Sequence, residues 1–274
     1  TASNFFSFIF FVIKSLKNNS KYLIISITPY TFFAYIILFI FRKKVFLYLW
    51  SDGHEEWKYL LGNWSVWIFR IMYIICTFRS EIIVCNKRLS KKKSHLISIS
   101  RLDETWFLKQ TKPYTKHASF LYVGRLSKEK GIFSFIDMLK DINSNIKLSI
   151  AGNSKNFNFE NPNIKLLGYI SDASSLIKAY DECNITILPS FTEGYPYVVD
   201  ESLARKRPVI IFEEISYVVN NKKGIFITKR NSNSLNNTIR FILKNYDQIQ
   251  EEMSRNLLPT KKSMLQQISD IIRI

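Results

Sequence analysis

From residue 119 onward, short apolar runs alternate regularly with segments in which apolar residues recur at helical spacing. The runs have the length of buried strands, and helices fit between them. The expected strands cover 120–123, 147–150, 164–167, 185–188, 208–212 and 225–228, and the expected helices cover 132–141, 174–182, 197–206 and 234–245. This alternation predicts an α/β fold in which helices cover both faces of a parallel sheet.

The first 116 residues follow a looser version of the same pattern. Expected strands cover 23–27, 45–50, 81–84 and 96–100, and expected helices cover 4–16, 31–41 and 64–78. The polar stretch from Lys109 to Lys116, which contains Pro113, is the best candidate for a linker. We therefore expect two Rossmann-like lobes with parallel sheets, an incomplete N-terminal lobe over 1–116 and a C-terminal lobe over 117–274.

Residues 23–41 form a mostly apolar run that is followed by Arg42, Lys43 and Lys44. A run of this length with a positive flank is also typical of a transmembrane helix. Ser26 and Pro29 divide it into a piece of strand length and a piece of helix length. We therefore favour a buried strand and a helix of the N-terminal lobe over a membrane span.

The chain carries a net charge of +17, from 39 Lys and Arg against 22 Asp and Glu. This excess favours an anionic partner such as nucleic acid, an anionic membrane surface or a phosphorylated substrate, although a lysine-rich composition also arises from AT-rich coding. Cations concentrate in the expected N-terminal lobe, at 42–44 and 87–93, which favours the membrane surface. The aromatic residues, 15% of the chain, lie mainly in apolar runs, so we expect core packing and no nucleic-acid partner.

The sequence does not indicate metal chemistry. Its 3 cysteines form no C-x-x-C pair, and its 3 histidines, His54, His95 and His117, have no metal-ligand spacing. There is also no D-x-D pair that would chelate a divalent cation. We expect no metal ion and no cofactor.

The segment GRLSKEKG at 124–131 lies between an expected strand and an expected helix. Ligands of open parallel sheets bind at the carboxyl ends of strands, where this segment falls. Gly124 allows a tight turn, Arg125 can bind phosphate oxygens in a bidentate manner, and Lys130 adds a second positive charge. The alternative is a solvated basic turn without a ligand.

A second segment, PSFTEGYPYVVDE at 189–201, also joins an expected strand to an expected helix. Its helix N-terminus offers unpaired N–H groups and a positive dipole end to an anion. Glu193 falls in the loop and Glu201 in the first turns of the helix, where carboxylates accept hydrogen bonds from hydroxyl groups such as those of a sugar. The alternative is that Glu201 is only a favourable charge near a helix N-terminus.

Together these segments resemble the nucleotide-binding half of the retaining glycosyltransferase family 4, which has the GT-B architecture. That family shows a G-R-L-x-x-x-K-G turn and, downstream, two glutamates eight positions apart in an E-G-x-P loop; this chain has GRLSKEKG and EGYPYVVDE, followed by LARKRPVI. The resemblance is strong over about 118–245 and looser over 20–107. Aligned in this way, the chain is expected to be truncated within the N-terminal lobe.

The resemblance implies roles for individual residues. Arg125 and Lys130 would hold the donor diphosphate, Glu193 would face the donor sugar, and these three form the expected catalytic set. Glu201 would bind the nucleotide ribose. The other expected binding residues are Gly124, the backbone of Gly194, Tyr195, Pro196, Tyr197, Val198 and Val199, and, near the base, Gly168, Tyr169 and Ile170.

The chain also departs from the family pattern. The family's Gly-rich phosphate loop has no counterpart in the N-terminal lobe. Ser51 and Asp52 occupy the expected position of an acceptor-side histidine, so His54 becomes a candidate for that role, against the alternative of a solvated loop histidine. The expected G-G-x-x-E segment reads EEISY at 213–217, so part of the sugar pocket differs.

The function that the resemblance implies is retaining transfer of a sugar from a nucleoside diphosphate to a lipid-linked or polysaccharide acceptor. We expect a bacterial enzyme of surface polysaccharide biosynthesis that is cytoplasmic and peripheral on the inner face of the plasma membrane. The alternatives are another GT-B nucleotide-sugar protein, such as an epimerase or a phosphorylase, or a basic nucleic-acid-binding protein without enzymatic activity.

Overall fold

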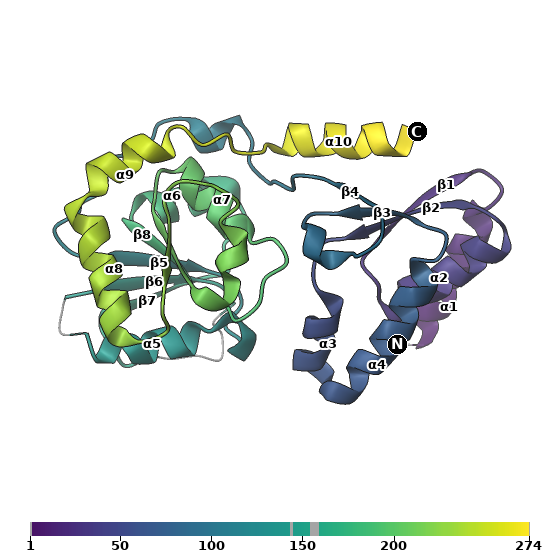
Figure 1. Ribbon diagram of the computed structural model, residues 1–274, viewed down its shortest axis with the longest axis horizontal. Helices are drawn as coiled ribbons and strands as arrows, with labels where there is room; N and C mark the ends of the chain where they lie inside the picture. The colour runs from purple at the N-terminus through teal and green to yellow at the C-terminus, as the bar shows by residue number, and fades with distance from the viewer. Residues whose placement is uncertain (1, 143–144, 154–158, 274) are drawn as a thin grey trace. The chain divides into compact units, whose positions relative to one another are not determined.

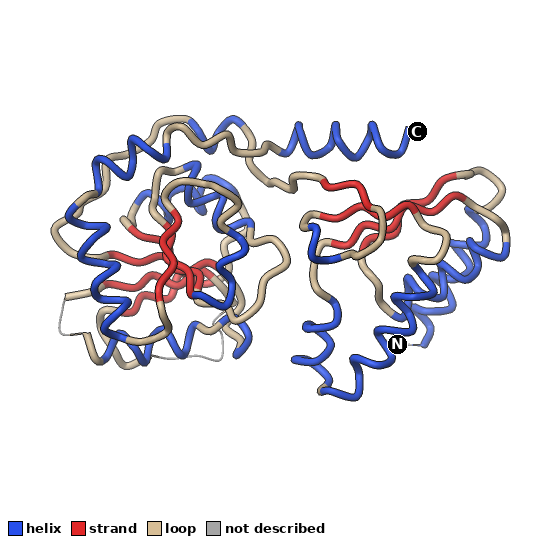
Figure 2. Tube along the Cα trace, in the orientation of Figure 1, coloured by secondary structure: helices blue, strands red, loops and turns tan. Residues whose placement is uncertain are grey.

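A computed structural model describes residues 2–142, 145–153 and 159–273 of the chain. It divides into two compact units (Figures 1 and 2). Unit 1 runs up to Ile99 and resumes at Lys262, and unit 2 is Ser100–Lys261. Each unit contains its own sheet, and every strand pairing in both sheets is parallel among the described residues. The predicted α/β class with two parallel sheets is thereby confirmed.

Unit 1 has a four-stranded sheet in the order β1-β2-β3-β4. The strands are β1 (Lys21–Ile25), β2 (Lys44–Leu49), β3 (Glu81–Val84) and β4 (Ser94–Leu96), and the helices before β4 are α1 (Ala2–Ser15), α2 (Pro29–Ile40), α3 (Gly53–Leu61) and α4 (Asn63–Cys76). Tyr35 and Leu38 of α2 and Phe69 and Met72 of α4 join one buried cluster with Leu47 of β2. This cluster gives unit 1 its own core.

The apolar run at 23–41 forms β1 and α2, separated by a turn. Ser26 has a positive φ of 60°, and Thr28 begins the helix by accepting a hydrogen bond from the Thr31 amide at 3.2 Å, just before Pro29. No helix among the described residues is long and apolar enough to cross a membrane. The prediction of a buried strand is wrong for β1, because this strand lies at the sheet edge and leaves Leu23 and Ile25 39% and 50% exposed.

Unit 2 has a six-stranded sheet in the order β10-β9-β8-β5-β6-β7, surrounded by helices (Figure 2). The strands are β5 (Ser119–Val123), β6 (Lys147–Ala151), β7 (Ile164–Gly168), β8 (Ile185–Leu188), β9 (Val209–Phe212) and β10 (Ile225–Thr228). The helices are α5 (Ile132–Lys140), α6 (Ala173–Asp181), α7 (Tyr197–Ala204), α8 (Ser232–Lys244) and α9 (Tyr246–Met253). These strands and the first four of these helices match the predicted ones closely.

The order of strands in unit 2 changes direction at β5. The chain leaves β5 toward β6 and β7 and then returns to add β8 on the other side of β5, with Phe120 opposite Ile185. A ligand crevice forms at such a switch point, outside the carboxyl ends of the two strands. The loops after β5 and β8 therefore meet at this crevice.

Among the described residues, three α-helices were not predicted: α3, α9 and α10 (Lys261–Arg273). In α3 the sequence was read as a loop, but Asp52 caps the helix by accepting a hydrogen bond from the His54 amide at 3.1 Å. The strand predicted at 96–100 lies instead at 94–96, where it forms β4 and Ser94 pairs with Ile82 of β3.

The segment at 100–116 is attached to unit 2 by two buried arginines. Arg205, which is 1% exposed, donates to the carbonyls of Trp106 at 2.9 Å and Leu108 at 2.7 Å. Arg207, which is 0% exposed, donates to the Thr111 carbonyl at 3.0 Å. These bonds account for a division between units at 99/100, whereas the sequence was divided at 116/117.

The C-terminal helix α10 belongs to unit 1. Lys21 at the start of β1 donates to the Ile272 carbonyl at 2.8 Å, and the Ser98 amide donates to the Gln267 side chain at 3.0 Å. Residues 2–99 therefore form one unit with residues 262–273, so a single dividing point in the sequence does not separate the two units.

We predict that Arg205→Met lowers the free energy of unfolding of unit 2 by about 3–5 kcal/mol, because it removes one partner of a buried ion pair and leaves backbone carbonyls unsatisfied. The lost contacts include two hydrogen bonds to the Asp181 carboxylate, at 3.0 and 2.7 Å. Urea unfolding followed by circular dichroism measures the change.

The matched control is Arg255→Met, which removes an exposed ion pair to Glu251 in the same unit. It should change the free energy of unfolding by less than about 0.5 kcal/mol. Equal effects of the two substitutions would show that Arg205 does not hold the 100–116 segment in place.

Candidate functional site

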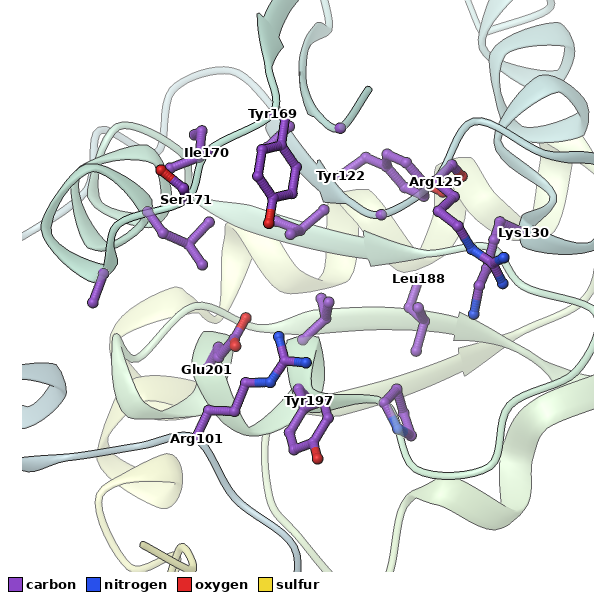
Figure 3. Close-up of a pocket in the computed structure, with 18 of the residues that line it drawn as sticks. Arg101, Tyr122, Arg125, Lys130, Tyr169, Ile170, Ser171, Leu188, Tyr197 and Glu201 are labelled. Carbon is purple, nitrogen blue, oxygen red and sulfur yellow. Dashed lines mark hydrogen bonds between the residues drawn. The ribbon is translucent and has the colours of Figure 1, made fainter. Parts of the chain in front are cut away.

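A cleft of about 920 Å³ opens at the carboxyl ends of β5 and β8 in unit 2 (Figure 3). The predicted site residues that line it are Gly124, Arg125, Lys130, Tyr169, Ile170, Glu193, Tyr195, Pro196, Tyr197, Val198 and Glu201. Three of the expected residues are not among those that line it, and two of these are Gly194 and Val199, of which Val199 is 2% exposed and packs in the core of unit 2. Gly168, at the end of β7, is also outside the lining.

The Glu193 carboxylate is held from two sides. Its Oε1 atom accepts from Lys130 Nζ at 2.7 Å and from Ser190 Oγ at 2.6 Å, and its side chain is 10% exposed. Lys130 follows β5 and Glu193 follows β8, so this ion pair joins the two loops. The pairing fixes a carboxylate and an ammonium group side by side in the cleft.

Tyr217 holds the backbone of the same loop. Its hydroxyl donates to the Glu193 carbonyl at 2.6 Å and accepts from the Glu193 amide at 3.0 Å. Tyr217 lies in the short helix η4 (Glu213–Val218), within the segment that departs from the family's G-G-x-x-E pattern. In this chain that segment therefore supports Glu193 through a tyrosine hydroxyl.

Gly131 explains how closely the two loops approach. It has a φ of +65°, and a Cβ atom there would lie 2.0 Å from the Pro189 carbonyl oxygen. The Phe191 amide also donates to the Glu129 carbonyl at 3.0 Å. A side chain at position 131 would push the loops apart and separate Lys130 from Glu193.

Glu201 lies on α7 with its carboxylate at the cleft wall and is 4% exposed. The Tyr180 hydroxyl donates to its Oε2 atom at 2.9 Å. Burial raises the pKa of the Glu201 carboxyl, and the Tyr180 hydrogen bond and the nearby Arg101 guanidinium partly oppose this rise. A buried carboxylate in a cleft needs hydrogen-bond donors, which a hydroxyl-rich ligand supplies.

The sequence analysis missed Arg101. Its guanidinium carbon lies 4.2 Å from the centroid of the Tyr197 ring, and Figure 3 shows the group between Tyr197 and Glu201. Arg101 lies outside both motifs, on the segment that was assigned to the other lobe. The long-range contacts of that segment with unit 2, among them the bonds from Arg205 and Arg207, bring Arg101 to the cleft. The cleft therefore has cations on the wall formed by α7 as well as after β5.

Arg125 is 70% exposed, and its Nη2 atom lies 3.6 Å from Glu129 Oε1. Its guanidinium group is therefore able to turn toward an anion in the cleft. The N-terminus of α7 adds further positive potential, because Pro196 begins the helix and no side chain caps its first turn. Arg125, Lys130 and this helix end together suit a phosphate ligand.

His54 lies in unit 1, near the start of α3. Its ring centroid is 4.7 Å from that of Phe69, and its Nδ1 atom is 3.7 Å from Asp52 Oδ1. These contacts fix the ring against α4. The acceptor-side role of His54 stays a prediction.

In the described part of the chain, no group of three or more His, Cys, Asp or Glu side chains is placed to hold a metal ion.

Comparison with known proteins finds a family match and two curated relatives. Residues 103–257 match the family described as "Glycosyl transferases group 1". A capsular polysaccharide biosynthesis glycosyltransferase of Staphylococcus aureus, CapM, is 30% identical over 151 residues, which are 49% of this chain and 39% of the relative. An uncharacterised glycosyltransferase of Methanocaldococcus jannaschii is 31% identical over 150 residues, 50% of this chain and 40% of the relative. The matches thus span about two fifths of each curated relative.

Solved structures match both units at low sequence identity. Sucrose-phosphate synthase of Thermosynechococcus elongatus has a TM-score of 0.74 at 16% identity, covering 98% of this chain and 78% of that one. HepE of Anabaena, solved in complex with UDP-glucose, has a TM-score of 0.73 at 16% identity, covering 97% of this chain and 82% of that one. These likenesses establish a shared fold.

We predict that Glu201→Gln stabilises unit 2 at neutral pH. The pKa of this carboxyl is higher in the folded than in the unfolded chain, so the folded state binds the proton more tightly and the free energy of unfolding falls as pH rises through the folded pKa. Glutamine cannot ionise and still accepts the Tyr180 hydrogen bond. Urea unfolding at several pH values measures the difference between variant and parent.

The difference should disappear below the ordinary pKa of glutamate, where Glu201 is protonated in both states. Glu251→Gln is the matched control, since Glu251 is an exposed residue of the same unit with a 73% exposed side chain. If Glu201→Gln were as stable as the parent at every pH, burial would not be raising the pKa.

Proposed function

This chain belongs to the family of group 1 glycosyl transferases, and from that premise we propose that it transfers a sugar from a nucleoside diphosphate donor to an acceptor. The observation that carries the proposal is the set of charges in one cleft: the cations Arg101, Arg125 and Lys130 with the carboxylates Glu193 and Glu201. The cations can bind the negatively charged oxygens of a diphosphate, and the carboxylates can accept hydrogen bonds from the hydroxyl groups of a ribose and a sugar. The fold class is that of the GT-B glycosyltransferases it resembles.

In the proposed reaction, Arg125 and Lys130 bind the diphosphate that leaves when the bond to the sugar breaks. Fixed cations stabilise the negative charge that develops on this leaving group, and the amides at the start of α7 add to them. Lys130 keeps further ammonium hydrogens for a phosphate while it donates to Glu193 at 2.7 Å. The positive charge comes from the protein, so the proposal includes no metal ion and no cofactor.

The nucleoside has a place at the other end of the cleft. Tyr169 is 78% exposed beside Ile170, directly after β7, and its ring offers a stacking surface for a base (Figure 3). Glu201 is placed to accept hydrogen bonds from the ribose, and Glu193 faces the sugar in our proposal. The HepE structures with UDP and UDP-glucose support a nucleoside diphosphate sugar as donor.

We assign the chain, again as a proposal, to the retaining glycosyltransferase family 4, with transfer that preserves the anomeric configuration. The GRLSKEKG and EGYPYVVDE motifs support this assignment. The capsular relative supports a bacterial role in surface polysaccharide biosynthesis, with a lipid-linked or polysaccharide acceptor. Such an acceptor places the protein in the cytoplasm, peripheral on the inner, anionic face of the plasma membrane.

The test of the reaction is release of free nucleoside diphosphate that depends on an added acceptor. An epimerase would convert the donor without an acceptor, and a phosphorylase would require inorganic phosphate. A nucleic-acid-binding protein would show no preference among nucleotide sugars and a steep salt dependence. Analysis of the product by NMR then shows whether the anomeric configuration is retained.

We predict that Lys130→Met and Arg125→Met each weaken binding of the preferred nucleoside diphosphate by about 10- to 150-fold, the loss expected for a hydrogen bond to a charged group. Binding of the corresponding nucleoside without phosphates should stay within about twofold of the parent. Calorimetry with uridine, guanosine and adenosine diphosphates identifies the preferred base and measures both affinities.

Lys128→Met is the matched control for this pair. Lys128 lies in the same turn and is exposed, but it does not line the cleft. It should leave the affinity for the diphosphate nearly unchanged. An equal loss for Lys128→Met would indicate general electrostatic attraction and contradict the assignment of Lys130 and Arg125.

We also predict that Glu201→Gln reduces the preference for a ribonucleoside diphosphate over its 2′,3′-dideoxy form. If the carboxylate accepts hydrogen bonds from ribose hydroxyls, the parent should prefer the ribonucleotide by roughly tenfold or more, and the variant should lose most of that preference. Calorimetry with both nucleotides measures the ratio. An unchanged ratio would remove Glu201 from the ribose site.

A further inference from the structure

The amino ends of the strands in unit 1 gather positive charge. In a parallel sheet these ends lie along one edge, and here each strand begins at or after a cation: Lys21 in β1, Lys43 and Lys44 at β2, Arg79 before β3, and Lys92 and Lys93 before β4. The C-termini of α2 and α4 reach the same edge (Figure 1). None of these cations belongs to the proposed donor site, which lies at the carboxyl ends of strands in unit 2.

A cavity of about 270 Å³ lies at this edge. Its charged lining is Arg42, Lys43, Lys44 and Arg79, and its other walls include Tyr35 and Phe39. The Glu81 carboxylate is a negative charge close to these four cations. It lies 2.9 Å from Lys44 Nζ and 3.6 Å from His95 Nε2. The balance of charge therefore suits an anion.

Two of the four cations are held by hydrogen bonds to carbonyls or by an ion pair. Lys43 Nζ donates to the Leu16 and Asn19 carbonyls at 2.7 and 2.9 Å, and Lys44 is paired with Glu81. Arg42 and Arg79 are exposed, and no carboxylate of the described residues lies within ion-pair distance of either guanidinium group. The Arg79 guanidinium carbon lies 5.5 Å from the centroid of the Phe39 ring, a contact that leaves its N–H groups free of a carboxylate. These two arginines remain available to an external anion.

A second cavity, of about 220 Å³, adjoins the first. The two share Tyr35 and Phe39, and the rest of the second lining is apolar: Ile36 of α2 with Ile74, Ile75 and Phe78 of the α4 end. Phe78 is 71% exposed and Ile74 55% exposed. Side chains this large stay exposed at a cost in hydration, which an apolar occupant would remove.

We propose that these adjoining cavities form a binding site for an anionic phospholipid. Arg42 and Arg79 bind the phosphate, and the start of an acyl chain lies against Phe39, Ile75 and Phe78. The two cavities share Tyr35 and Phe39, and one is lined by cations while the other is apolar. A ligand that fills both cavities is therefore anionic at one end and apolar at the other. The site anchors unit 1 to a membrane surface. It deepens the membrane part of the proposed function and does not depend on sugar transfer.

The test measures binding of the full chain to vesicles of phosphatidylcholine with and without 30% phosphatidylglycerol, by flotation. The parent should bind the anionic vesicles and bind pure phosphatidylcholine poorly. Arg42→Gln/Arg79→Gln should lower the partition coefficient by roughly 30-fold. Phe78→Ser should lower it by about tenfold, because it removes apolar contact while leaving the charge unchanged.

Two matched controls lie in unit 2. Arg240→Gln/Arg255→Gln removes the same charge from two exposed positions, one in α8 and one in the turn after α9, and Phe241→Ser removes a phenylalanine that is 54% exposed. Both should bind anionic vesicles within about threefold of the parent. A loss equal to that of the unit 1 variants would overturn the site and indicate attraction by net charge or general hydrophobicity.

Thermal unfolding separates a lipid headgroup from free phosphate. Inorganic phosphate or glycerol phosphate at millimolar concentration should not raise the unfolding temperature of the parent more than that of the Arg42→Gln/Arg79→Gln variant. Selective protection together with unchanged vesicle binding would overturn the lipid assignment. Nucleoside diphosphate affinity is measured on the same variants and should not change, so a failure of the donor site is recognised separately from a failure of the lipid site.

Discussion

The parallel pairing of β5 with β8 is the constraint on which the rest of unit 2 depends. Residues 124–184 separate these strands in the sequence, yet the strands are neighbours in the sheet and end on the same side. Parallel neighbours place their following loops together, so the two motifs form one cleft without any direct sequence proximity. The contacts across this junction, Lys130 with Glu193 and the Phe191 amide with the Glu129 carbonyl, then fix the distance between the loops.

The cleft is held by residues that would not bind a ligand themselves. Tyr217 holds the Glu193 backbone by two hydrogen bonds, and Tyr180 orients the Glu201 carboxylate from α6. Gly131 removes the side chain that would separate the loops. A binding site built from charged groups depends on neighbours that limit the motion of those groups, because small displacements weaken their effect on a ligand.

Most of the fold of unit 2 was predictable, because each of its strands is an apolar run and each of the helices α5 to α8 has apolar residues at helical spacing. The motif residues were predictable because both motifs are local and follow a strand. Arg101 and Tyr217 were not, since each reaches the site through long-range contacts that no spacing reveals. The exposure of Leu23 and Ile25 in β1 could not be predicted either. Their apolar side chains are typical of a buried strand, and they are exposed because β1 lies at the edge of the sheet.

The attachment of 100–116 to unit 2 determines where an expressed fragment of this protein should begin. A fragment that starts at 117 would leave Arg205 and Arg207 without the carbonyls of Trp106, Leu108 and Thr111, and would delete Arg101 from the cleft wall. Two buried guanidinium groups would then face the interior with unsatisfied N–H donors, which favours misfolding during expression. A fragment that starts at Ser100 keeps these bonds and carries the complete cleft lining.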